Sequence, residues 1–498
     1  MKNTLIQISI FAIILFILAR CKKDDFLFNP SDNFYIADTT FLNALLDQGV
    51  DKNGDGLISY EEAEAVTVLK VDQKDITFLA GIEMFVNLDT LSCEFNNLMH
   101  LDVSKNNALR YLNCRFNQLT SLDVSNNEKL ESLNCSGNQL TGLDLSKNTS
   151  LKELGCGSNQ LSELDVSKNV ALEYLECSND QLTSLNIKSN TALTTLTCGR
   201  NKLSALDLSG NPKLDYLWCA ENQLTSLDVS GNTKLLRLYC WTNQLSELDV
   251  SMNSALIQLY CDENKLSSLD VSHNQVLEDI SCNNNLMTEL DLSKNPVLGS
   301  LGCSSNSISQ LDVSNNTLLG YLICSNNLLT SLNVSGNSNL TYFACDGNQL
   351  TGLDLSANKL LQTLSCDNNL LTSLDLSGNT GLMYLLCSDN KLTSLDLTKN
   401  SELEFLVCED NQLTSLDLTG LTALNLLYCG GNQLSSLDIS SNTTLGSFGY
   451  YYYSYALSIT DMPSLQKICV WTMPFPPSGL ALDKSGSPNV YFTTDCSE

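Results

Sequence analysis

Seventeen cysteines recur at a fixed interval of 21 residues, and this spacing limits the possible folds more than any other feature of the chain. They stand at positions 93, 114, 135, 156, 177, 198, 219, 240, 261, 282, 303, 324, 345, 366, 387, 408 and 429, with no insertion between them. A strict period of this length is typical of stacked supersecondary units that bury their apolar faces against one another. Residues 88–444 are therefore predicted to form a solenoid of 17 equal units.

The columns of the repeat indicate what each position does. Each unit follows the pattern L-x-x-L-x-C-x-x-N-x-L-x-x-L-D-[VLI]-S-x-N, for which Leu130 to Asn148 is representative. Two columns are asparagine in 16 of 17 units, with Asp180 and Leu421 as the exceptions, and a stacked amide can pair the backbone groups that a tight turn leaves free. The in-out-in alternation predicts one strand at L-x-C and a second at L-D-V.

This pattern is that of a leucine-rich repeat with Cys in place of the last strand Leu. The 21-residue unit and its column of cysteines resemble the internalin J-like repeats of bacterial surface proteins. The resemblance implies a mainly β, right-handed parallel solenoid with a concave binding face. Residues 69–87 resemble the first coil of such proteins. Residues 445–498 are predicted to form an irregular cap, because the last coil exposes an apolar end that must be covered. Internalins are adhesion and invasion proteins, so the resemblance also implies a protein-binding adhesin or scaffold, without identifying the partner.

The first 38 residues are predicted to direct and tether the chain. Lys2 precedes an apolar stretch from Leu5 to Leu18, which has the length of a secretion signal and is short for a spanning helix. The sequence around Cys21 resembles a bacterial lipoprotein signal, although Arg20 stands where a small residue is usual. The resemblance implies cleavage and lipidation at Cys21, with 22–38 as a tether and the protein facing outward from the outer membrane. An uncleaved signal anchor is the alternative.

Residues 39–68 are predicted to form a small α-helical calcium module. Asp51 to Glu62 fits the loop pattern D-x-[DN]-x-[DN]-G-x5-E at every specified position and resembles a single EF-hand or dockerin-like loop. Calcium takes six to eight oxygen ligands around such a loop. The expected ligands are Asp51, Asn53, Asp55, Leu57 through its carbonyl, Ser59 and Glu62. A structural role is favoured over a regulatory one, because sensor proteins usually pair such loops.

The cysteines outside the signal have three interpretations: disulfides, metal ligands or stacked free thiols. In-register coils hold equivalent Cβ atoms about 4.8 Å apart on parallel vectors, whereas a disulfide needs about 3.8 Å and converging ones. No C-x2-C cluster is present. The repeat cysteines are therefore predicted to be free thiols in the core. Cys469 and Cys496 lie in the cap and are a candidate disulfide pair whose geometry the sequence leaves open.

Charge and motifs argue against nucleic-acid binding and catalysis. The formal net charge is −29, and such an acidic surface repels phosphate backbones. His100 and His273 stand eight coils apart, so they cannot share a site, and no hydrolase, zinc-protease or P-loop motif occurs. An aspartate follows the L of L-D-V in 15 of 17 units. This column is predicted to be a solvated face, with weak calcium binding as the alternative.

The candidate ligand site is aromatic. Concave strand positions mostly hold small polar residues, but three neighbouring units instead supply Tyr216, Trp218, Arg237, Tyr239, Trp241 and Tyr260. Aromatic side chains with polar handles are common in protein hot spots and in sugar-stacking platforms. The partner is therefore predicted to be a cell-surface protein, with a glycan as the alternative, and the chain is predicted to be monomeric. A purely structural role on the strand surface is the third interpretation.

Overall fold

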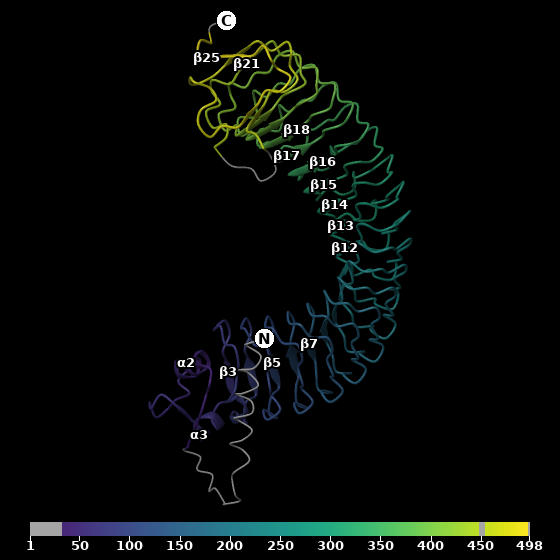
Figure 1. Ribbon diagram of the computed structural model, residues 1–498. Helices are drawn as coiled ribbons and strands as arrows, with labels where there is room; N and C mark the ends of the chain where they lie inside the picture. Colours follow the sequence, from purple (N-terminus) through teal and green to yellow (C-terminus); the bar gives the residue numbers. More distant parts are fainter. Residues whose placement is uncertain (1–31, 448–453, 497–498) are drawn as a thin grey trace, which may run out of the picture.

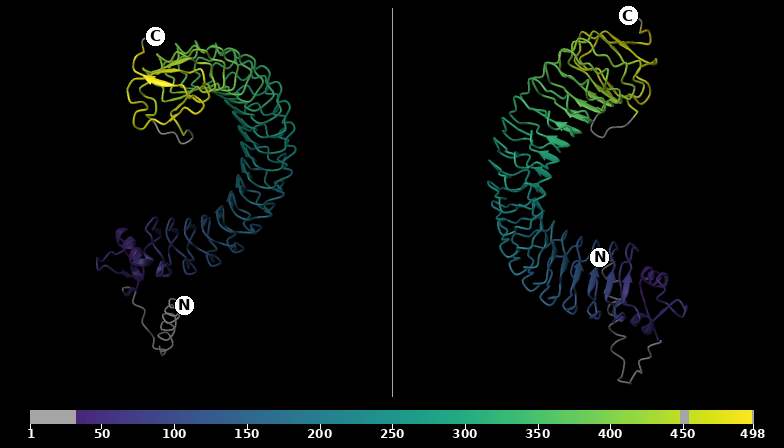
Figure 2. Two further views of the ribbon diagram at one scale, coloured as in Figure 1. Left: turned by 45° about the horizontal axis from the view of Figure 1, so that its top comes forward. Right: turned by 180° about the vertical axis from the view of Figure 1, so that it is seen from behind.

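The computed structural model describes residues 32–447 and 454–496, and within them the chain is one curved solenoid (Figure 1). The coils stack along an arc with the short strands on its inner side, and the two ends of the arc lie far apart (Figure 2). The predicted mainly β solenoid with 21-residue coils is confirmed. Cys21 and the tyrosines 450–453, which the sequence suggests as part of the cap, lie outside the described residues. Within the described ranges, no helix is long and apolar enough to span a membrane.

One strand per coil forms the inner face. The strands are β3 Val68–Lys70, β4 Thr90–Ser92, β5 Tyr111–Asn113, β6 Ser132–Asn134, β7 Glu153–Gly155, β8 Tyr174–Glu176, β9 Thr195–Thr197, β10 Tyr216–Trp218, β11 Arg237–Tyr239, β12 Gln258–Tyr260, β13 Asp279–Ser281, β14 Ser300–Gly302, β15 Tyr321–Ile323, β16 Tyr342–Ala344, β17 Thr363–Ser365, β18 Tyr384–Leu386, β19 Phe405–Val407, β20 Leu426–Tyr428, β22 Leu457–Ser458 and β24 Leu482–Asp483.

These strands make one open parallel sheet from β3 to β24. From β4 to β20, the central apolar residue of each strand, usually leucine, pairs in register with its equivalent 21 residues later, as Leu217 does with Leu238 and Leu238 with Leu259. Identical neighbours specify this register, because a slip of one residue would turn every inward leucine toward solvent. Residues three and one before each cysteine therefore line the concave surface in continuous columns.

The predicted second strand at L-D-V is wrong for nearly all described coils. Only β21 (Ser436–Asp438) is a strand at this position, besides one isolated bridge between Asp165 and Asn186. These segments lie on the outer side of the arc, where curvature spreads the coils beyond the spacing that ladder hydrogen bonds need. The aspartate side chain also accepts a hydrogen bond from the backbone two residues later, as Asp249 Oδ1 does from Ser251 N at 2.9 Å.

The core is a continuous apolar column with two asparagine ladders at its edges. In the coil of Cys261 the fully buried side chains are Leu256, Leu259, Cys261, Leu266 and Val271. Burying one such leucine is worth about 1.5–3 kcal/mol. All 17 repeat cysteines are free and buried, as predicted, and burial raises the pKa of each thiol, to about 12 at Cys219.

The first asparagine ladder closes the turn after each strand. Asn264 Nδ2 donates to the carbonyls of Cys240 and Cys261 at 3.1 Å each, while its Oδ1 accepts from Leu245 N at 3.0 Å. In the second ladder Asn253 Nδ2 donates to the carbonyls of Val229 and Asn232. Each amide thus links two coils, which explains why these columns tolerate so few substitutions within the chain.

A small helical module covers the first coil. It contains β1 (Asn33–Phe34) paired antiparallel with β2 (Ile58–Ser59), helices α2 (Thr39–Asp47) and α3 (Tyr60–Glu64), and the short helix η1 (Ile82–Met84) of the first coil. Asp38 joins the module to that coil: Oδ1 caps α2 at the N–H groups of Thr40 and Phe41, and Oδ2 accepts from Thr77 and Phe78. Burial raises the pKa of Asp38, but these hydrogen bonds outweigh it and hold the pKa below its ordinary value.

The carboxyl-terminal cap adds a second short sheet. Here β21, β23 (Lys467–Cys469) and β25 (Tyr491–Thr493) pair in parallel on the outer side of the last coils. A disulfide joins Cys469 to Cys496, whose Cα atoms are 5.5 Å apart. It connects this sheet to the end of the described chain.

Candidate functional site

Strands β10, β11 and β12 place the predicted aromatic residues side by side on the concave sheet. The ladder pairs Trp218 with Tyr239 and Tyr239 with Tyr260, so one column holds three aromatic rings in succession. Tyr216 pairs with Arg237 in the neighbouring column, and Trp241 follows the cysteine of its own coil. The structure thus brings all six predicted ligand-binding residues onto one surface, which we call the aromatic cluster.

The rings of the aromatic cluster contact one another. The centroids of Tyr239 and Tyr260 are 5.0 Å apart, and those of Tyr239 and Trp241 are 5.8 Å apart, with tilted planes. Trp218 and Trp241 are separated by 6.1 Å, and Tyr216 meets Tyr239 edge-on at 5.4 Å. These distances lie within the range of favourable aromatic pairs. The five rings are half-buried, while Arg237 is exposed, so the cluster presents a rigid surface rather than projecting side chains.

Hydrogen bonds fix two of its hydroxyl groups. Tyr239 donates to Gln258 and Tyr260 donates to Asp279, both in the next coil. Burial and the bond to the Asp279 carboxylate raise the pKa of Tyr260 well above its ordinary value, so this phenol stays protonated. The cluster therefore combines fixed apolar ring faces with a carboxylate and an amide at its edge.

The position of the Trp218 ring requires a glycine in the preceding coil. The ring lies over Gly199, where an added Cβ would come within 2.9 Å of the indole. Its Nε1–H is buried and has no hydrogen-bond partner among the described residues. Glu221 at the cluster's edge pairs with Arg200 at 2.8 Å.

The structure also shows an aromatic surface that the sequence reasoning missed. Tyr321 on β15 and Tyr342 on β16 stack with centroids 5.9 Å apart and planes 18° apart. Tyr321 is 54% exposed. Both residues occupy the column three before the cysteine, so inspecting that column along the whole repeat would have found them.

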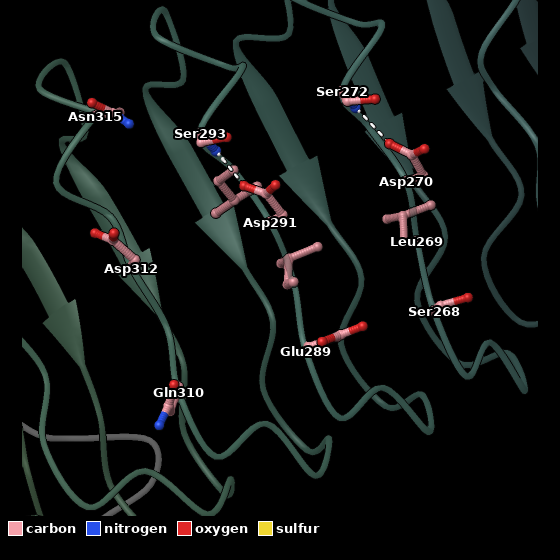
Figure 3. A pocket seen from close by; sticks show the side chains of 12 residues that line it. Ser268, Leu269, Asp270, Ser272, Glu289, Asp291, Ser293, Gln310, Asp312 and Asn315 are labelled. Atoms are coloured by element: carbon pink, nitrogen blue, oxygen red, sulfur yellow. Dashed lines mark hydrogen bonds between the residues drawn. The ribbon is translucent and has the colours of Figure 1, made fainter.

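The outer side of the coils carries shallow acidic grooves. One such groove has a volume of ~660 Å³ and is lined by the aspartate column, with Asp270 and Asp291 accepting from Ser272 and Ser293 (Figure 3). The same groove recurs around Asp144 and Asp165. Because it repeats with the coil, it follows from the repeat geometry rather than from a special set of residues.

The predicted calcium loop lies at the start of α3. Gly54 and Gly56 adopt positive φ angles of 77° and 79°, which curl the loop. Asp51 accepts from the N–H groups of both glycines, at 2.6 and 2.9 Å. Asn53 Oδ1 accepts from Asp55 N, and Asp55 Oδ1 accepts from Leu57 N. The residue types and the loop curvature thus fit a hard, oxygen-bound cation.

Glu62, a predicted calcium ligand, is hydrogen bonded to groups of its own loop. Its carboxylate accepts from the backbone N–H groups of Lys52, Asn53 and Ser59 and from the Ser59 hydroxyl. Burial raises the pKa of Glu62, but these four hydrogen bonds outweigh it and lower the pKa. In the described chain the three loop carboxylates do not gather within one coordination sphere. Glu62 would therefore have to exchange these bonds in order to bind an ion.

Comparisons with known proteins place this architecture. No protein-family model matches the sequence, and a search of curated proteins finds no match. Among solved structures, a leucine-rich-repeat protein of Leptospira interrogans is 24% identical with a TM-score of 0.62, covering 67% of this chain and 93% of its own. The plant peptide hormone receptor RGFR1, in complex with RGF2, is 18% identical with a TM-score of 0.62, covering 86% and 95%. These two likenesses concern the fold alone.

A third structure is more similar in sequence. The functional domain of InlJ from Listeria monocytogenes, which includes a cysteine ladder, is 32% identical, with a TM-score of 0.59. The match covers 77% of this chain and 76% of that domain. The shared feature is the cysteine ladder, which in this chain consists of 17 buried free cysteines. The chain therefore belongs to the internalin-like leucine-rich-repeat proteins that carry a cysteine ladder.

Proposed function

We propose that this protein binds another protein through the concave face of its solenoid, as a surface adhesin or scaffold. The aromatic cluster supports the proposal most directly. It is a contiguous, half-buried group of five rings with an arginine beside it, the composition found in the centres of protein interfaces. The complex of RGFR1 with RGF2 indicates that the same fold serves as a receptor for a peptide elsewhere.

Truncating two tryptophans tests this function. In a pull-down with the mature chain, the double variant Trp218→Ala and Trp241→Ala should bind any captured partner at least ~10-fold more weakly, because central aromatic residues carry most of the binding energy of an interface. Tyr111→Ala is the matched control, since it removes a concave aromatic ring far from the cluster. Unchanged affinity in the double variant would exclude the cluster as the binding site.

A glycan is the second candidate ligand. Rings with a carboxylate and an amide at their edge, here Asp279 and Gln258, are also suited to stacking and hydrogen bonding with a sugar. A glycan array separates the two candidates, because a glycan ligand would bind in the absence of any protein partner.

For the loop at residues 51–62 we propose a structural calcium ion. Asp51, Asn53, Asp55, Ser59 and Glu62 would supply side-chain oxygens, and Leu57 its carbonyl; the curled loop and the oxygen-rich donor set support this. The bound ion would fix the loop between helices α2 and α3.

Removing calcium should destabilise the wild-type module. A ligand at ~10 times its Kd stabilises the native state by ~1.4 kcal/mol, so melting with EDTA should occur a few degrees lower than with calcium. In Glu62→Gln the two melts should coincide, whereas in Glu61→Gln, which alters an exposed neighbour, the difference should persist. Equal melts in the wild type would refute the calcium site.

We further propose that Cys21 is lipidated and tethers the solenoid to the outside of the outer membrane. The support is the sequence around Cys21 alone. Fractionation of cells tests it: Cys21→Ser should move the protein out of the membrane fraction, and unchanged membrane association would contradict a lipid anchor.

A further inference from the structure

The concave face is charged unequally along its length. From strand β12 to the coil of β20, the strand positions and the two residues after each cysteine contain no lysine, arginine or histidine. The acids at these positions are Asp262, Glu263, Asp279, Asp346, Asp367, Asp389, Glu409 and Asp410. We call this stretch the acidic half of the concave face. In the preceding eight coils, the same positions hold both charges, and Arg115 and Arg200 pair with Glu94 and Glu221.

Neutral groups, not cations, hold these acids. Asp346 Oδ1 accepts from the hydroxyls of Ser325 and Ser365, at 2.8 and 3.0 Å. Glu409 accepts from the Ser458 hydroxyl at 2.8 Å. Within residues 88–444, all five ion pairs lie between Asp89 and Glu221, outside the acidic half. Several of its carboxylates are therefore oriented by neutral groups, and none of them forms an ion pair within residues 88–444.

Burial and neighbouring carboxylates raise the pKa values of three acids on this surface. Burial, together with the neighbouring carboxylates of Asp346 and Asp389, raises the pKa of Asp367 to about 7. Burial and nearby acids also raise the pKa of Glu409 and of Asp410. A positive charge placed here would relieve this repulsion.

The acidic half also contains ring faces. Tyr321 and Tyr342 stack on each other; Tyr342 lies in the coil that carries Asp346, and the next coil carries Asp367. At its other end the aromatic cluster contributes Tyr260, beside Asp262 and Asp279. A guanidinium group is attracted both by the face of an aromatic ring and by a carboxylate. The two features together select for arginine-rich rather than merely apolar ligands.

We propose that the partner of the concave face presents a cationic, arginine-bearing polypeptide segment to strands β12–β20. This inference rests on the proposed protein-binding function and specifies its partner by charge. The parallel sheet offers an uninterrupted surface on which an extended segment can cross several coils. Complementary charge would raise the association rate and make it depend steeply on salt.

A matched set of charge variants tests the inference in the full mature chain. The probe is a synthetic peptide of ~12 residues containing arginine, tyrosine and serine, compared with the same peptide carrying neutral citrulline in place of arginine. Binding is measured by fluorescence anisotropy at low and at physiological salt. The concave variant is Asp346→Asn, Asp367→Asn and Glu409→Gln. The convex control is Asp354→Asn, Asp375→Asn and Asp417→Asn.

Both variants replace three acidic side chains with their amides and should fold. Asn283 naturally occupies the column of Asp346, and Asn333 naturally occupies the column of Asp354 and caps Ser335 in the same way. We expect the arginine peptide to bind at least ~10-fold more weakly to the concave variant, and less than ~2-fold more weakly to the convex control. The citrulline peptide should bind weakly to both.

Two results would overturn the inference: equal losses in both variants, which indicate unspecific charge attraction, or no preference for arginine over citrulline. The proposed function can survive either result. A captured partner whose binding needs Trp218 and Trp241 but not the three concave acids would retain the binding face and reject only the cationic segment.

Discussion

Replacing Asp180 with asparagine is expected to raise the free energy of unfolding by ~1–3 kcal/mol at pH 8 and to change it little at pH 4. Asp180 stands where the other described units have the ladder asparagine. Its Oδ1 accepts from the N–H groups of Asn159 and Leu161, as a ladder amide would. Its Oδ2 is buried and has no partner in the described chain.

The sign of the effect follows from protonation. Burial raises the pKa of Asp180 to about 7, although the two backbone hydrogen bonds oppose the change. The unfolded carboxyl titrates near 3.9, so the native state binds the extra proton between these values. Protonation of Asp180 therefore favours the folded state fully below pH ~4, and this contribution to the free energy of unfolding is lost as the pH rises toward 7. Asparagine cannot ionise, and its Nδ2 can donate to the carbonyls that the carboxylate faces.

Asp144→Asn is the matched control for this prediction. It removes the same charge from a nearby coil, but Asp144 is exposed and hydrogen bonds to Ser146 lower its pKa. Urea denaturation at pH 4, 6 and 8 measures both variants. A gain for Asp180→Asn that does not grow with pH would contradict a buried, ionising carboxyl in the ladder.

Asn264→Ala is expected to lower the free energy of unfolding by ~1–3 kcal/mol. The amide of Asn264 contacts two consecutive coils, and its loss leaves the buried Leu245 N without its partner. It also removes one of the two ladder amides that donate to the carbonyls of Cys240 and Cys261, which keep those of Asn243 and Asn285. Each buried polar group left unpaired costs ~1–3 kcal/mol. Urea denaturation checks the value.

Two further variants separate this effect from a loss of side-chain bulk. Lys265→Ala alters an exposed neighbour in the same coil and should change stability by less than ~0.5 kcal/mol. Asn264→Asp recreates the situation of Asp180, so its destabilisation should grow from pH 4 to pH 8. A loss for Asn264→Ala no larger than that for Lys265→Ala would show that the ladder is not an important source of stability.

The period of the cysteines was enough to predict the coil, because every unit repeats the same inward leucines and turn asparagines. The register of β10 against β11 and the burial of Cys219 both follow from that repetition. The prediction of a second strand was wrong because the curvature belongs to the whole stack of coils, and no single unit specifies it. Within one repeat, L-D-V has the alternation of a strand whether or not its neighbours are close enough to pair.

The sequence was enough to predict which residues of the candidate site lie together, but not which contacts they make. The columns place Trp218, Tyr239 and Tyr260 together, yet only the structure shows that Tyr260 donates to Asp279 and that the rings pack into a half-buried group. The pair Tyr321 and Tyr342 was not predicted, although both residues occupy the column three before the cysteine. For Glu62, the loop pattern predicts a metal ligand, and this stays a prediction. The pattern did not indicate that its carboxylate accepts from the backbone N–H groups of Lys52 and Ser59.

Site-specific photo-crosslinking tests most directly whether the concave face is the binding surface. A photoreactive phenylalanine analogue is placed at Tyr239 on the concave sheet or at Ser251 on the outer side of its coil, and the mature chain is illuminated with cell-surface extract. We predict one discrete covalent adduct from position 239, whose formation is suppressed by an excess of unlabelled wild-type protein. No adduct is expected from position 251. An adduct formed from position 251 alone would contradict binding through the concave face.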